Sequence, residues 1–129
     1  MGVKFIKVAV IYFIIGVCMG MYMGITDQFV FTSAHAHINL LGWVSLAVTG
    51  LIYHVFPVAG NSKLAKVHFW FHMIGVPLLT ISMIFFGVGN FSVGIPLSAV
   101  GGILVIAGVL VFVVNVMKNV KSLGSVDVT

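Results

Sequence analysis

Histidine is the residue type in this sequence best suited to carry chemistry, and all five copies lie in the middle of the chain. His35 and His37 form a His-x-His pair, and His54, His68 and His72 follow it. Neutral imidazole is a ligand for iron, copper and zinc. The surrounding residues are mostly apolar, and a polar side chain inside an apolar span is costly, so its presence there points to a function.

The His35–His37 pair cannot chelate one metal ion if the segment is helical. Residues two positions apart on an α-helix point about 200° apart. The pair can instead serve two sites on opposite faces of the helix. Those sites could be two flat macrocycles, or one site inside the subunit and one at an interface. The alternative is a merely polar, interfacial start of a helix, and we prefer the functional interpretation.

The remaining histidines are spaced differently. His68 and His72 are four residues apart, which places them on one face of a helix, and His54 ends the preceding helix at a similar level. Three histidines at one level could bind a transition metal. The alternative, which we prefer here, is that they are interfacial residues that meet lipid headgroups and water.

Two further sets of residues carry weaker signals. One is a polar stripe at four-residue spacing, formed by Ser45, Thr49 and Tyr53. It is interpreted as a source of inter-helix hydrogen bonds, with a proton or water path as the alternative. The other is a run of thioethers formed by Met19, Met21 and Met23. Thioethers can bind copper(I), but alternate residues of a helix face opposite sides, so packing is the preferred interpretation.

The elements that position these residues must be membrane helices. Hydrophobic residues make up 61% of the 129 residues and charged residues only 6%, against about 25% in a typical soluble domain. A soluble fold of this size could not hide so much apolar surface, so lipid is the expected solvent. The only acids are Asp27 and Asp127, which excludes catalysis by paired carboxylates.

Four segments are long enough to cross a bilayer, which takes about 20 mostly apolar residues. They run approximately over residues 5–25, 34–56, 64–87 and 94–117. The short connections favour antiparallel neighbours, so we predict an all-α membrane protein with four transmembrane helices in up-down order. Its domain covers residues 1–117, and a polar cytoplasmic tail covers residues 118–129. The first stretch is interpreted as an uncleaved span, because no clear small-x-small cleavage site follows it.

The net charge of +4 comes from six lysines, which lie at helix ends. They occur in pairs before the first span, between the second and third, and after the fourth: Lys4, Lys7, Lys63, Lys66, Lys118 and Lys121. The positive-inside rule then predicts a multi-pass protein of the inner or plasma membrane with both termini in the cytoplasm. The lysines are expected to contact lipid headgroups, not nucleic acid.

Small residues at four-residue spacing indicate close helix packing. Gly16, Gly20 and Gly24 form such a row in the first span. Gly94, Ser98 and Gly102 form another in the fourth. Both rows are interpreted as packing signals without catalytic meaning.

The two histidine-bearing helices resemble a known family. The first is similar to the tenth helix of the catalytic subunit of the haem–copper oxidases, through Ala34, His35, Ala36, His37, Gly50, Tyr53, His54, Phe56 and Pro57. The second is similar to the helix that follows it in those enzymes, through Ala65, Lys66, Val67, His68, Phe69, Trp70, Gly75 and Val76. The similarity runs without a gap inside either helix and includes the turn closed by Pro57 and Gly60.

The resemblance implies haem ligands and a fold. It implies that His35 matches the ligand of the high-spin haem, where oxygen or nitric oxide reacts, and His37 the ligand of the low-spin haem. His68 and His54 match positions without ligand status. The family's subunit is a twelve-helix ring of approximate three-fold symmetry, and this chain resembles its last third. A homotrimer of four-helix chains would rebuild the ring, because closed cyclic symmetry is the usual form of such assemblies.

The chain also departs from the family pattern. The family's copper ligands and proton-path carboxylates lie on helices that have no counterpart here, which puts oxygen reduction by the usual mechanism in doubt. We therefore expect a haem b protein that transfers electrons from a donor or binds a diatomic gas. The alternatives are a minimal or partner-completed oxygen or nitric oxide reductase, a copper-handling protein, and an assembly subunit without a cofactor.

The resemblance further suggests where a haem would sit. Ser33, Ala34 and His35 are similar to the run that supplies the second low-spin ligand in the family. In a homotrimer, one helix would then play both roles at each interface. We therefore expect a haem between subunits, bound by His37 of one chain and His35 of the next.

Overall fold

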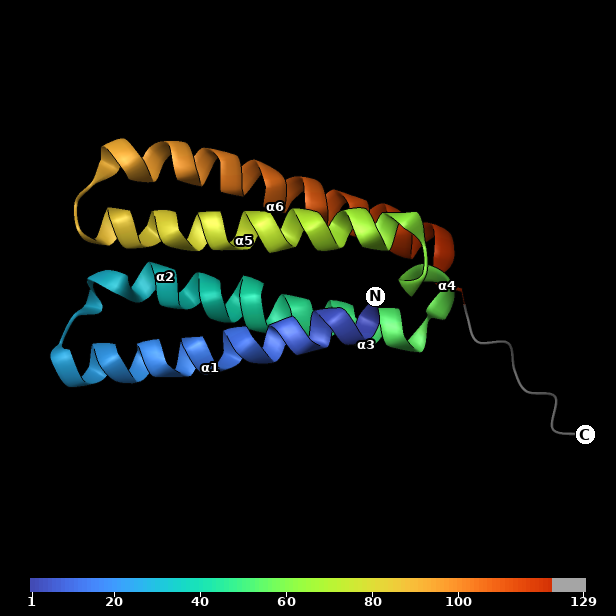
Figure 1. The fold of residues 1–129 in the computed structure, drawn as a ribbon, viewed down its shortest axis with the longest axis horizontal. Coiled ribbons are helices and arrows are strands. Elements are labelled where there is room, and N and C mark those ends of the chain that lie inside the picture. The colour runs from blue at the N-terminus through green and yellow to red at the C-terminus, as the bar shows by residue number, and fades with distance from the viewer. Residues whose placement is uncertain (122–129) are drawn as a thin grey trace, which may run out of the picture.

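The computed structural model describes residues 1–121, and all regular secondary structure in this part of the chain is helical (Figure 1). Four helical spans are long and apolar enough to cross a membrane: Gly2–Thr26, Phe29–Val55, Lys63–Gly87 and Phe91–Asn119. The prediction of an all-α chain with four helices long and apolar enough to cross a membrane is thereby confirmed. Most of the predicted polar tail, residues 122–129, lies outside the described residues.

Three spans are single regular helices, and the second is composite. The elements are α1 (Gly2–Thr26), the 3₁₀-helix η1 (Phe29–Phe31), α2 (Thr32–His37), the π-helix η2 (Ile38–Ser45), α3 (Leu46–Val55), the short α4 (Pro57–Gly60), α5 (Lys63–Gly87) and α6 (Phe91–Asn119). The first span ends where Asp27 adopts a left-handed conformation. Polar caps begin the last two spans. Ser62 Oγ accepts from the backbone N–H of Ala65 at 3.0 Å, and Asn90 Oδ1 accepts from that of Val93 at 3.3 Å, as N-cap residues commonly do.

The π-helix η2 is the feature of the second span that the sequence did not predict. It covers eight residues and begins directly after His37. A π-helix is wider than an α-helix and is rare, and where it occurs it is often near a functional site. At its end, the Ser45 hydroxyl donates to the carbonyl oxygen of Leu40 at 2.7 Å, five residues back. Because a π-helix has more residues per turn than an α-helix, η2 rotates α3 about the span axis relative to α2. The directions of the side chains in α3 therefore do not follow from those in α2 by α-helical spacing alone.

The spans form two pairs. The third and fourth, α5 and α6, pack along each other most extensively, and α1 packs along η2 and α3. The pairs meet where α2 lies beside α5 (Figure 1). Residues 56–62 lie at one end of the bundle, and the other two connections lie at the opposite end.

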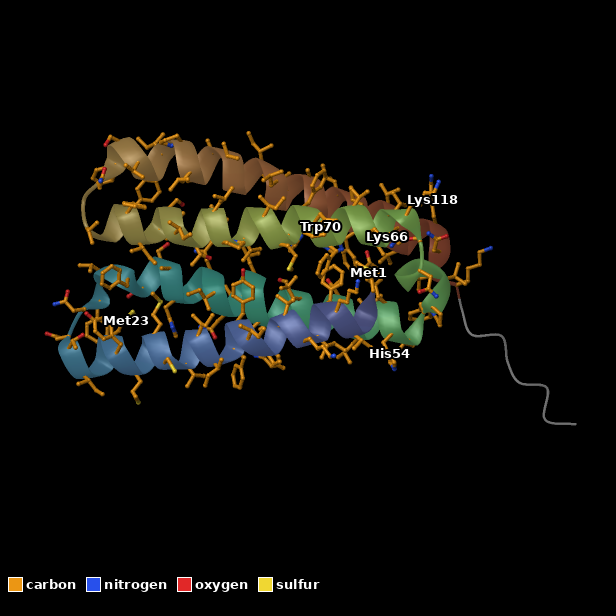
Figure 2. The ribbon with its side chains drawn as sticks, in the orientation of Figure 1. Met1, Met23, His54, Lys66, Trp70 and Lys118 are labelled. Carbon is orange, nitrogen blue, oxygen red and sulfur yellow. The ribbon has the colours of Figure 1, made fainter. Side chains whose placement is uncertain are left out.

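The charges are unevenly distributed between the two ends. Figure 2 shows Lys66 and Lys118 near the end that also carries Met1 and His54, with Met23 near the opposite end. The lysines lie in the first two turns of α1, in the first turn of α5, and at or just beyond the end of α6. These helix ends share one end of the bundle, which we call the lysine end. The one acid among residues 1–121, Asp27, lies in the connection at the other end.

The glycine rows pack within the chain, and the predicted spacing is only partly right. A Cβ on Gly16 or Gly20 would meet Asn39 or His35 of the second span, but one on Gly24 would meet nothing within 4 Å. In α6 the glycines that face α5 are seven residues apart: Gly94, Gly101 and Gly108. Gly102 faces open space, so it takes no part in packing within the described chain, and its predicted role as a packing residue stays a prediction. Seven residues are close to two helical turns, which keeps the true row on one face.

Candidate functional site

His37 has one ring nitrogen hydrogen-bonded to the backbone of its own helix. Its Nδ1 lies 2.7 Å from the carbonyl oxygen of Ser33, one turn earlier in the chain. A carbonyl can only accept, so Nδ1 carries a hydrogen, and in the neutral ring Nε2 then keeps its lone pair. A hydrogen bond from the other ring nitrogen to a backbone carbonyl is the usual arrangement of histidines that bind a metal. Because the side chain is only half-buried, a ligand outside the chain can reach it.

His35 occupies a different environment, against the first span. A Cβ on Gly20 would lie 2.9 Å from its Cε1, so the absence of a side chain there makes the space for the ring. Asn39 lies one turn further along, and its Nδ2 is 2.9 Å from the His35 carbonyl oxygen and 3.4 Å from Nδ1. Because α2 is a regular α-helix through both histidines, their side chains diverge by about 200°. The structure therefore does not bring His35 and His37 together at one site.

A buried polar network lies near the lysine end of the bundle. Tyr53 Oη lies 3.1 Å from His68 Nδ1, and Asn115 Nδ2 donates to Tyr53 Oη at 3.1 Å. Since the carboxamide supplies a hydrogen to the phenol oxygen, the phenol hydrogen is available for His68. The same Nδ2 donates to the carbonyl oxygen of Ala59 at 3.1 Å. Three spans are thereby connected through side chains in the interior.

Asn115 is the centre of this network, and the sequence analysis did not single it out. Its Oδ1 accepts from Ser62 Oγ at 2.9 Å and from Asn119 Nδ2 at 2.7 Å. The residue is fully buried. A signal was present in the sequence, because Asn115 is a carboxamide inside an apolar span, and such residues are costly unless partnered. It ties the last span to the turn between the second and third.

His68 and His72 are buried in the bundle, which corrects the interpretation that they meet lipid headgroups. They are 1% and 2% exposed. The ring of His68 is packed between Phe5 at 5.0 Å and Phe112 at 5.2 Å, centroid to centroid, and lies 4.5 Å from that of His72. The headgroup interpretation was wrong because proximity to a helix end in sequence does not say which face of the helix points inward.

His54 does not join the other two histidines. It is exposed, and Figure 2 shows it at the surface of the lysine end. Within residues 1–121 there is no group of three histidine, cysteine or acidic side chains arranged to hold a metal ion. The three-histidine metal centre, which the sequence analysis gave as the less favoured alternative, therefore has no counterpart in the described chain.

The methionine run and the polar stripe on the second span do not form single sites either. Met21 is 66% exposed and Met23 is 6% exposed, so the thioethers do not converge. In the polar stripe, Tyr53 makes inter-helix hydrogen bonds as predicted, whereas Ser45 bonds within its own span. Thr49 is buried and lines a cavity beside His72.

The network predicts a cost for removing Asn115. In Asn115→Ala the hydroxyls of Tyr53 and Ser62 and the carbonyl of Ala59 lose a partner. We expect the free energy of unfolding in mild detergent to fall by about 2 kcal/mol, since an unpaired buried polar group costs about 1–3 kcal/mol. Asn61→Ala, at an exposed residue, is the matched control and should change little. Equal losses for the two variants would show that the network does not stabilise the fold.

Comparison with protein-family models, with curated proteins and with solved structures finds no match to this chain. The geometry of the described residues therefore carries the functional argument. That geometry is a helical chain whose four spans are long and apolar enough to cross a membrane, with the backbone-bonded imidazole of His37 near one end and a buried polar network near the other.

Proposed function

We propose that this chain is a haem b-binding membrane protein that transfers electrons or binds a diatomic gas, with His37 as the iron ligand. The observation that carries the proposal is the hydrogen bond from His37 Nδ1 to the Ser33 carbonyl, which leaves Nε2 free. A bound haem would supply one-electron chemistry or a gas-binding iron, and the chain would tune it through the histidine and its burial. The resemblance of residues 34–76 to the haem-binding helices of the oxidases supports the same assignment.

We place the haem between subunits of a homotrimer, with His35 of the next chain as the second ligand. The roughly opposite directions of the two side chains allow one helix to serve two haems. In this arrangement the His35 ring has to turn away from Gly20 and Asn39. Gly24 and Gly102, which face open space in the single chain, are available for close contacts with neighbouring subunits. The four spans would then run up and down as one third of an oxidase-like ring.

The test of the haem proposal is the absorption spectrum of the purified protein, oxidised and reduced. Two imidazole ligands would make a low-spin iron, so sharp reduced bands of a six-coordinate b-type haem are expected. A colourless protein that takes up no added haem would contradict the proposal. Native mass spectrometry in mild detergent should show three chains, and a monomer that keeps its haem would contradict the shared site.

A second candidate is a reductase for oxygen or nitric oxide, completed by another subunit. One observation favours it: His35 and His37 lie in different environments, as two separate haem sites would require. In that case His35 would serve a high-spin site of its own. Co-purification of a large oxidase-like partner would support this candidate, and the histidine variants discussed below distinguish it from the shared site.

The lysine end is proposed to face the cytoplasm in an inner or plasma membrane, because positive charge is retained on that side. The connection at Asp27 should then be outside. In a Cys18→Ser background, Asp27→Cys is expected to react with an impermeant maleimide added to intact cells. Asn61→Cys, in the connection at the lysine end, should react only after the membrane is opened. Labelling in the reverse pattern would invert the orientation.

A further inference from the structure

A cavity beside the buried His72 has features that the haem proposal does not use. Its volume is about 360 Å³, and it lies between the second span and the α5–α6 pair. Its lining includes Val44, Ser45, Val48, Thr49, His72 and Phe112. The size falls within the range of about 300–1,000 Å³ that is typical of small-molecule sites, which are mostly apolar with a few convergent polar groups.

Three polar side chains face this otherwise apolar cavity. His72 lines the cavity, and its ring has no hydrogen-bond partner among the described residues. Its Nδ1 is buried against Gly108, where an added Cβ would come within 2.7 Å, so the ring nitrogen left for a ligand in the cavity is Nε2. Neutral imidazole offers one donor and one acceptor, and an unpaired buried polar group is costly. Thr49 and Ser45 add two hydroxyls, of which that of Ser45 already donates to Leu40. A ligand that both donates and accepts at separated points would satisfy this set.

The π-helix builds one wall of the cavity. Leu41, Val44 and Ser45 belong to η2 and all contribute to the lining. The opposite wall includes Phe112, whose ring is fixed by Tyr53 at 5.8 Å and by His68 at 5.2 Å. An uncommon helix form and a braced aromatic ring therefore face the same space. π-helical segments are often found at functional sites, which is an argument independent of His72.

The residues that line the cavity favour a neutral ligand over a charged one. It contains no acidic residue and no lysine, and every lining residue belongs to a membrane span. A second cavity, at the lysine end, is lined by Lys118 and Lys121 and would suit an anionic headgroup. The cavity at His72 has no such cation, so a phosphate-bearing lipid headgroup would not be compensated there. A neutral molecule that arrives through the lipid fits it better.

We propose that this cavity binds the headgroup of a membrane-soluble quinone or quinol. The ring is neutral and planar and can pack against Phe112, and its two oxygens can pair with His72 and Thr49. The apolar tail would leave between lipid-facing residues such as Val48 and Val109, which are 50% and 42% exposed. The inference concerns binding alone and needs no haem, so it goes beyond the function proposed above.

The experiment titrates the purified protein in lipid nanodiscs with a short-chain ubiquinone and counts bound quinone per chain. Saturation near one quinone per chain is expected. His72→Leu should raise the dissociation constant at least about tenfold, and Thr49→Val about fivefold, as the loss of one hydrogen bond implies. Thr80→Val is the matched control, because Thr80 is a buried, unpartnered threonine that lines another cavity. Its affinity should equal that of the unchanged protein.

Val109→Trp provides a variant that fills the cavity without touching a polar group. The residue faces lipid, so the substitution leaves the buried network in place, and the affinity should again fall at least about tenfold. This keeps the proposal testable if His72→Leu does not fold. Non-saturable uptake, or equal affinity in the unchanged protein, Thr49→Val and Val109→Trp, would overturn it. Because the titration is done on haem-free and haem-containing protein alike, its outcome is separate from that of the haem proposal.

Discussion

His37→Ala is expected to abolish the low-spin spectrum of the proposed haem. The variant removes the nitrogen that the Ser33 hydrogen bond leaves free, so the iron loses an axial ligand outright. Losing only the hydrogen-bond partner of a metal ligand costs roughly 10–100-fold in affinity, and loss of the ligand itself should exceed that. Haem content per chain and the reduced absorption spectrum measure the effect. His54→Ala, at an exposed histidine outside the proposed site, is the control and should keep both unchanged.

The behaviour of His35→Ala separates the two arrangements of the haem. If the haem is shared between subunits, this variant should lose the six-coordinate spectrum just as His37→Ala does. Co-expression of the two single variants should restore part of it, because some interfaces would combine His37 from one chain with His35 from another. His68→Ala should leave the spectrum nearly unchanged. A full six-coordinate spectrum in His35→Ala, with its loss in His37→Ala, would exclude the shared site and favour the reductase candidate.

Gly101→Ala and Gly102→Ala are expected to act in opposite directions on stability, although the residues are adjacent. A Cβ at Gly101 would lie 2.6 Å from the backbone nitrogen of Leu79 and 3.0 Å from the Gly75 carbonyl oxygen. Backbone atoms cannot move aside as a flexible side chain can, so α5 and α6 would have to separate. Overpacking of this kind costs about 1–3 kcal/mol.

Gly102 supplies the matched control. A Cβ there would meet nothing within 4 Å, and alanine in a helix is favoured over glycine by up to about 1 kcal/mol. Thermal or denaturant unfolding in mild detergent should therefore place Gly102→Ala at or above the unchanged protein and Gly101→Ala well below it. Equal stabilities would mean that α5 and α6 are not packed through this glycine. If Gly102→Ala alone disturbs the trimer, Gly102 lies at a subunit contact.

The spans could be predicted from sequence because length and hydropathy determine them. The predicted span 64–87 and the observed α5 differ by one residue at the start, where Ser62 caps the helix. The packing between the helices was harder to predict from the sequence. A row of glycines gives a spacing but not a direction, and Gly101, not Gly102, proved to face α5. The choice between adjacent residues depends on the rotation of the whole helix, which is set by contacts that the sequence does not express locally.

In the candidate sites, too, local helix geometry could be predicted and contacts between helices could not. The opposite directions of His35 and His37 follow from helix periodicity alone. The hydrogen bond to Ser33 and the space at Gly20 required coordinates. The burial of His68 and His72 depends on α6. There Gly108 lies against His72, and Asn115 donates to Tyr53, the partner of His68. The π-helix had no recognised local signal, so the cavity that it lines could not be anticipated either.

The central position of Asn115 has a consequence for how the protein is made. Ser62 and Asn115 are 53 residues apart in the chain, and a ribosome adds roughly 5–20 residues per second. For roughly 3–10 seconds after Ser62 is synthesised, the partner of the turn at Ala59 has not yet emerged. Until Asn115 is made, the polar groups of this turn that bind it need another partner, such as water. The network is therefore completed only by the last helix, and a chain that stalls before Asn115 leaves Ser62, Tyr53 and the Ala59 carbonyl without this partner.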